Sequence, residues 1–208
     1  MVRGIKPRTA ATVAAVGLAF ATLATVTPAS AAGSAAPAKD HPVRLASVTG
    51  SARIFYAFRP DDEIRFTVDA QAAPYTRRFP DDPQLKDGLP TDARGTIHFT
   101  HRKAETGEVG TADAAVDCLV TGDHVATLTA VITKSDAMPV GQRVGLSISQ
   151  GHGHAKDRLG FSWGVVNLDV DANGKPVQPV VGTCMAPAPF APVVDGGYTV
   201  RPGDLEVR

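Results

Sequence analysis

The stretch from Asp113 to Thr133 constrains the fold of this chain more than any other part of the sequence. It predicts two long β-strands joined by a turn at Thr121-Gly122-Asp123. After the turn, Ala, Leu and Ile alternate with Val and Thr, so that two faces repeat with period two. Branching at Cβ disfavours a helix and suits a pleated surface. A short loop containing glycine between two such runs indicates a β-hairpin.

Several shorter segments repeat this alternating pattern. The clearest is residues 63–70, in which Ile64, Phe66 and Val68 alternate with charged or polar residues. Further candidates lie at residues 52–58, 94–101, 143–148, 158–165 and 198–200. No segment after residue 31 carries a helical stripe of useful length. We therefore predict an all-β domain, either an antiparallel β-sandwich or a small β-barrel, with about seven to nine strands. The pattern alone does not decide between sandwich and barrel.

Residues 1–31 have the layout of a secretory signal peptide. Three basic residues come first, an uncharged apolar run follows, and Ala29-Ser30-Ala31 forms a small-residue cleavage site. A membrane anchor is the alternative, although the apolar run is at the short edge of what spans a bilayer. We expect the signal peptide to be cleaved. Export by the general secretory route is expected, because no twin-arginine pair stands near the start. Residues 32–47 are then a flexible linker, and residues 48–208 are a single all-β domain.

Loss of the expected signal peptide changes the charge balance. Residues 1–31 hold three of the 21 basic residues and none of the 21 acidic ones, so the mature chain has a net charge of about −3. The remaining basic residues are scattered, which argues against a nucleic-acid surface. No later stretch could span a membrane as a helix. We expect a secreted, extracellular monomer with no nucleic-acid partner.

Residues 73–93 interrupt the strand pattern. The segment contains four prolines with charged residues between them. A loop of this length is either a binding loop or disordered. Tyr75 and Phe79 make it less polar than a pure linker. We interpret it as an excursion that its aromatic residues hold against the domain.

The histidines offer a possible metal site. His152 and His154 lie in a glycine-rich loop, and together with His98, His101 or His124 they could bind zinc or copper. The spacing signal is weak, and His98 and His101 point to opposite faces of one strand. Solvent-exposed histidines are the simpler interpretation, so we assign no metal ligand.

Residues 169–174 match the start of a calcium-binding loop, with oxygen-bearing side chains at alternate positions and a glycine for the bend. The match then fails, because Val180 stands where a bidentate glutamate belongs. A tight hairpin turn at Asn173-Gly174 explains the same residues. No metal or other cofactor is therefore expected.

Two patterns could suggest catalysis. Ser162 lies in a G-x-S-x-G string, but a nucleophile elbow needs a strand-to-helix turn in an α/β sheet, and Ser162 falls within an alternating strand. The carboxylate pairs Asp61-Asp62 and Asp81-Asp82 lie beside proline in turns, where Asp is common for backbone reasons. We predict no catalytic residue and no enzyme activity.

The only two cysteines, Cys118 and Cys184, are predicted to form a disulfide. Both follow the signal peptide, and an exported domain with two thiols tends to pair them. By alternation, Cys118 shares the apolar face of Val116 and Val120. Cys184 lies in a Pro- and Ala-rich segment with no strand period, so the bond would tie that segment to the sheet. Two buried free thiols are the competing interpretation.

The run VDCLVTGDHVATLTAVIT, the sequence KDRL at residues 156–159, Cys184 and the ending PVVDGGYTV form a recognisable set. Over about residues 52–200 the chain resembles a family of small secreted actinobacterial β-proteins of uncharacterised function. Typical members carry an acidic Asp-Asn-Gly-type loop where this chain has residues 151–154, which argues against a shared ligand. The resemblance implies secretion and a β fold, and it implies no catalytic residue.

Two classes of function remain. The first is a secreted non-catalytic domain that is structural or binds a partner. The second is a closed β-barrel that holds a small apolar ligand in a cavity of several hundred Å³. A secreted hydrolase ranks third. We expect a barrel to show such a cavity and a sandwich to show a filled core.

Overall fold

The computed structural model describes residues 44–164 and 167–206. These residues lie in one unit, His41–Arg208, and they form strands and turns without a helix. The expected signal peptide and the linker as far as residue 43 lie outside the described residues. The first strand begins at Ser47, one residue before the expected start of the domain.

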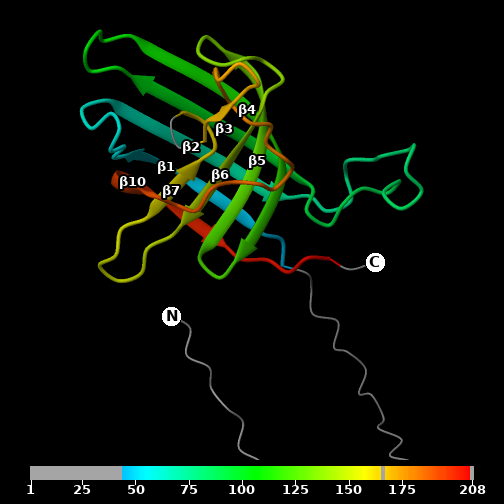
Figure 1. Ribbon diagram of the computed structural model, residues 1–208. Helices are drawn as coiled ribbons and strands as arrows, with labels where there is room; N and C mark the ends of the chain where they lie inside the picture. Colours follow the sequence, from blue (N-terminus) through cyan, green and yellow to red (C-terminus); the bar gives the residue numbers. More distant parts are fainter. Residues whose placement is uncertain (1–43, 165–166, 207–208) are drawn as a thin grey trace, which may run out of the picture. The chain divides into compact units, whose positions relative to one another are not determined.

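Eight antiparallel strands close into a barrel in the order β1-β10-β7-β6-β5-β4-β3-β2 (Figure 1). Their bounds are β1 (Ser47–Ile54), β2 (Glu63–Ala72), β3 (Ala93–Arg102), β4 (Val109–Gly122), β5 (Val125–Ser135), β6 (Arg143–Ser149), β7 (Arg158–Phe161) and β10 (Ala191–Arg201). The predicted all-β antiparallel fold is confirmed, and of the two alternatives it is the barrel. Closure depends on β1 pairing with β10, from Ser47 opposite Arg201 to Ile54 opposite Val193.

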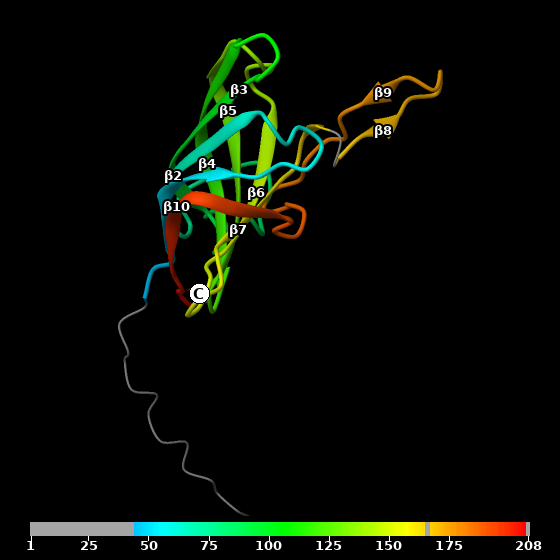
Figure 2. The same cartoon turned by 90° about the vertical axis from the view of Figure 1, so that its left-hand side faces the viewer.

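Two very short strands stand outside the barrel. β8 (Asp169–Val170) and β9 (Pro176–Val177) form a hairpin that projects away from it (Figure 2). The predicted turn is present: the Asp171 side chain accepts hydrogen bonds from the amides of Asn173 and Lys175. The oxygens that resemble a calcium loop therefore serve the turn itself.

Inward-facing side chains from all eight strands fill the barrel. Phe66, Phe99, Phe161 and Trp163 pack together towards one end, with ring centroids 5.1 to 5.7 Å apart. Fully buried side chains such as Phe66 each contribute about 1.5–3 kcal/mol through removal from water. The core of this barrel is packed with side chains. The expectation that a barrel would enclose a ligand cavity therefore does not hold for it.

Trp163 marks one end of the barrel, here called the Trp163 end. The loops at this end are residues 55–62, 103–108 and 136–142, and the chain between β7 and β10 also leaves from it. The β4–β5 turn and the loop at residues 150–157 lie at the opposite end. The strand predicted at residues 158–165 is shorter in the structure, where β7 ends at Phe161.

A β-bulge in β4 reverses the expected orientation of Cys118. Val116 pairs with Ala130 but Cys118 pairs with Thr129, so Asp117 is an extra residue and the register shifts. Beyond the bulge it is Leu119 that joins the barrel core. The expectation that Val116 and Cys118 share a face is therefore wrong: Cys118 lies on the outer face.

The outer face of β5, β6 and β7 is covered by residues 182–190, here called the strap. The disulfide Cys118–Cys184 ties the strap to β4, with the two Cα atoms 5.4 Å apart, which confirms the predicted bond. The Ser147 hydroxyl on β6 donates to the carbonyl of Pro187. A Cβ on Gly160 of β7 would stand 2.4 Å from the strap's carbonyl oxygen at Ala188, so the strap needs a glycine there.

Side chains complete the seam between β7 and β10, where only two residue pairs are in register. Asp157 accepts hydrogen bonds from the amides of Gly151 and Tyr198, and Gln150 accepts one from Val200. Asp157 and Gln150 thus accept β10 amides that are not paired with β7. Burial, with the Asp157 carboxylate nearby, raises the pKa of Tyr198 well above its usual value, and its hydroxyl donates to the Phe66 carbonyl at 3.1 Å.

Candidate functional site

The structure distributes the histidines over several surfaces. His98 Nδ1 lies 2.6 Å from Asp113 on the outside of the barrel. His101 Nε2 lies 2.7 Å from Asp62, which links β3 to the β1–β2 loop. The backbone amide of Ala104 and the His101 ring hold the pKa of Asp62 below its ordinary value of 3.8. The two β3 histidines face opposite sides, as predicted.

His124 and His152 come together at the opposite end of the barrel, with ring centroids 3.5 Å apart. His124 also contacts Asp123 at 2.9 Å, and His154 is exposed in the same loop as His152. Within residues 44–164 and 167–206, no group of three or more His, Cys, Asp or Glu side chains could hold a metal ion.

Ser162 lies directly beyond the end of β7 and is 4 % exposed. Its hydroxyl oxygen accepts a hydrogen bond from the Gly145 amide at 2.8 Å, and its own amide donates to the Gly145 carbonyl. Ser162 therefore extends the β6–β7 pairing. Of the two carboxylate pairs, Asp62 contacts His101, and Asp82 accepts a hydrogen bond from the Gln84 amide within the 73–93 loop.

The 73–93 loop forms an arm at the side of the barrel whose base is fixed by one buried carboxylate. Asp92 is 2 % exposed, and its Oδ2 accepts hydrogen bonds from the amides of Thr76, Arg77 and Leu89 at 2.9 to 3.2 Å. Of the two aromatic residues expected to hold the loop, Tyr75 makes such a contact, because its hydroxyl donates to the Glu206 carbonyl, whereas the Phe79 ring lies against Arg77 within the loop. The arm is therefore held at its base by Asp92, a residue that the sequence pattern did not single out.

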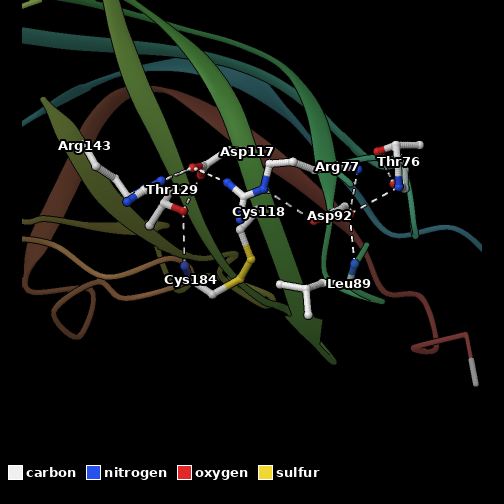
Figure 3. A network of polar contacts seen from close by, with 10 residues as sticks. Thr76, Arg77, Leu89, Asp92, Asp117, Cys118, Thr129, Arg143 and Cys184 are labelled. Carbon is white, nitrogen blue, oxygen red and sulfur yellow. Dashed lines mark hydrogen bonds and ion pairs between the residues drawn. A yellow bond between two sulfur atoms is a disulfide. The ribbon is translucent and has the colours of Figure 1, made fainter. Parts of the chain in front are cut away.

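A continuous polar network joins this arm to the strap across the bulge (Figure 3). Asp117 lies at its centre: Thr129 donates to its Oδ1 at 2.6 Å, while Arg143 and Arg77 contact its Oδ2 at 2.9 and 3.3 Å. The Cys184 amide in turn donates to the Thr129 hydroxyl at 3.1 Å. Charge-assisted contacts of this kind are stronger than neutral ones. The bulge thus presents Asp117 where it can bind two arginines directly and, through the Thr129 hydroxyl, the strap.

A groove of about 660 Å³ lies at the Trp163 end and is here called the Trp163 groove. Its apolar wall is formed by Val131, Met138, Trp163, Val180 and Val181. A second groove of about 490 Å³ adjoins it and shares Met138 and Trp163. Apolar surface in a hollow of this size, beside a few polar groups, is typical of a small-molecule site.

Three polar side chains border the apolar wall of the Trp163 groove. Gln142 donates to Gln178 at 3.4 Å, and among the lining residues that the structure describes Arg143 alone is charged. Arg143 also belongs to the Asp117 network, so the groove and the disulfide-bonded strap are connected. Sequence reasoning missed this site, because Trp163 was expected within a strand and residues 178–181 show no period.

Comparison with protein-family models, curated proteins and solved structures finds no match for this chain. The resemblance to secreted actinobacterial β-proteins therefore stays a prediction. In the part of the chain that the structure covers, there is no helix with the length and hydrophobicity needed to cross a bilayer.

Proposed function

We propose that this protein is a secreted, non-catalytic binding domain that holds a small apolar molecule in the Trp163 groove. The proposal rests on apolar side chains that line the groove and are not buried in the barrel core. The barrel interior is filled, whereas Val180 is 98 % exposed and yet lines the groove. The disulfide supports export, because such bonds persist in oxidising compartments.

The position of Ser162 supports a non-catalytic role. A nucleophile must be able to approach a substrate with an active base nearby. The Ser162 hydroxyl oxygen instead accepts a hydrogen bond from the Gly145 amide of β6, and Ser162 is almost fully buried. The open groove therefore suits a binding role better than the buried Ser162 suits hydrolysis.

The single tryptophan provides a direct test. The neutral fluorescent probe N-phenyl-1-naphthylamine should bind the folded protein with a saturable signal, and excitation of Trp163 should transfer energy to it. Val180→Ser should weaken binding about threefold by removing apolar contact while leaving the melting temperature unchanged. Val125→Ser, at the opposite end and also exposed, is the matched control and should bind like the wild type. Absent or non-saturable binding, or equal effects of the two variants, would contradict the proposal.

A further inference from the structure

We propose that the molecule held in the Trp163 groove carries one negative charge and that Arg143 binds it. The inference rests on the proposed function and adds the chemical class of the ligand: a small apolar anion such as a carboxylate or sulfonate. Its basis is the charge of the groove. Of the lining residues that the structure describes, Arg143 alone is charged, and its partner Asp117 is not part of the lining, so an anion is the charge that this surface complements.

The guanidinium of Arg143 is only partly used within the protein. Its Nε and Nη2 both lie 2.9 Å from Asp117 Oδ2, and its side chain remains 30 % exposed. In the described part of the chain, no hydrogen bond involves its Nη1. Arginine has five N–H donors in a planar fork, so a ligand oxygen can be bound while the contact with Asp117 persists.

Asp117 holds Arg143 in position before any ligand arrives. The Asp117 side chain is 12 % exposed and is itself fixed by Thr129 and Arg77. Arg77 in turn lies 3.9 Å from the buried Asp92. Negative and positive charges therefore alternate along the network, and Arg143 is the member that lines the groove. An arginine that is already ordered loses less conformational entropy on binding than a free side chain.

The remaining polar groups suit the same ligand. Gln142 and Gln178 contact each other and are neutral, so they can donate to an anion without adding charge. Met138, Trp163 and Val180 provide the surface for an apolar body. The volume of about 660 Å³ lies in the range of pockets for small molecules.

A matched pair of probes separates charge from apolar contact. 8-Anilino-1-naphthalenesulfonate is N-phenyl-1-naphthylamine with an added sulfonate. In titrations followed by energy transfer from Trp163, we expect the wild type to bind the sulfonate about fivefold to tenfold more tightly than the neutral probe. The preference should decrease as salt is raised, because screening weakens a partly exposed ion pair.

Arg143→Gln should abolish the preference, so that this variant binds the two probes with similar affinity. Arg201→Gln, an exposed arginine at the opposite end, removes the same charge and should keep the preference. Circular dichroism of each variant checks folding, and the salt dependence of the wild type tests the inference even if Arg143→Gln fails to fold.

Two kinds of failure can be told apart. If the neutral probe binds in the groove but the sulfonate binds no more tightly, or if Arg201→Gln loses the preference as Arg143→Gln does, the charge inference is wrong and the proposed function stands. If neither probe receives energy from Trp163 on saturable binding, the proposed function itself is wrong.

Discussion

Gly145 lies directly beneath Met185: a Cβ on Gly145 would stand 2.0 Å from the Met185 carbonyl oxygen. Gly145 is in the middle of β6, a position where glycine is normally unfavourable. The close approach of the strap explains it. The same strap carries Cys184 and follows directly after Val181 in the wall of the Trp163 groove, so its contact with β6 bears on both stability and binding.

Gly145→Ala should therefore displace the strap. We expect a loss of about 1–3 kcal/mol in the free energy of unfolding, as for overpacking in a filled site, together with weaker binding of the neutral probe. Gly122→Ala is the control, because Gly122 is also in a strand and a Cβ there would meet no atom within 4 Å. Urea unfolding measures both variants; equal stability of Gly145→Ala and the wild type would mean that the strap does not press on β6.

Removal of the disulfide should lower stability by up to about 4 kcal/mol, because the bond closes a span of 66 residues. Cys118→Ser and Cys184→Ser should lower the melting temperature similarly, and the double variant should be no worse than either, since each removes the same bond. Intact mass under non-reducing conditions should show the loss of two hydrogens. Rapid thiol labelling of the native protein would count against the bond.

Asp92→Ala should destabilise the domain by about 3–5 kcal/mol, because three partly buried amides would lose the buried acceptor that they share. Asp92→Asn should cost less, about 1–2 kcal/mol, since its carbonyl oxygen can replace Oδ2 while only the contact with Arg77 is lost. Limited proteolysis should then cut Asp92→Ala first within residues 73–92. Equal effects of the two substitutions would show that charge, rather than the hydrogen bonds, matters.

The contact of Asp62 with Ala104 and His101 predicts a pH dependence. Because the folded pKa of Asp62 is lowered, its contribution to stability is present above the unfolded value of 3.8 and disappears as the pH falls through the folded value. The difference in unfolding free energy between the wild type and Asp62→Asn should shrink as the pH falls below 3.8. Asp61→Asn, at an exposed neighbouring position, is the control. A difference that persists at low pH would contradict this account.

Local pattern predicted much of the fold. Alternation at Ile64, Phe66 and Val68 correctly indicated β2, and the glycine-containing turn correctly joined β4 to β5. Barrel closure could not be predicted in this way, because it depends on pairing between strands at the two ends of the domain, such as Val48 with Val200. Periodicity within a segment carries no information about a partner so distant in the chain.

The candidate site was beyond the reach of pattern for two physical reasons. One extra residue at Asp117 reverses every face that follows it, and nothing in the local sequence marks the bulge. The groove is lined by segments without regular structure, including residues 178–181, whose position depends on the disulfide and on contacts made elsewhere. The two cysteines were the exception, because their pairing follows from their number and the expected compartment.

The central claim is that the Trp163 groove binds an apolar ligand, and chemical-shift mapping tests it most directly. In ¹H–¹⁵N spectra of the uniformly labelled protein, addition of N-phenyl-1-naphthylamine should shift the single indole Nε1–H resonance of Trp163 and the amides of Val131, Met138 and Val181. Amides of the 73–93 loop and of the His124 turn should stay unchanged. Shifts confined to those distant segments, or an unchanged Trp163 resonance at saturating probe, would contradict the account.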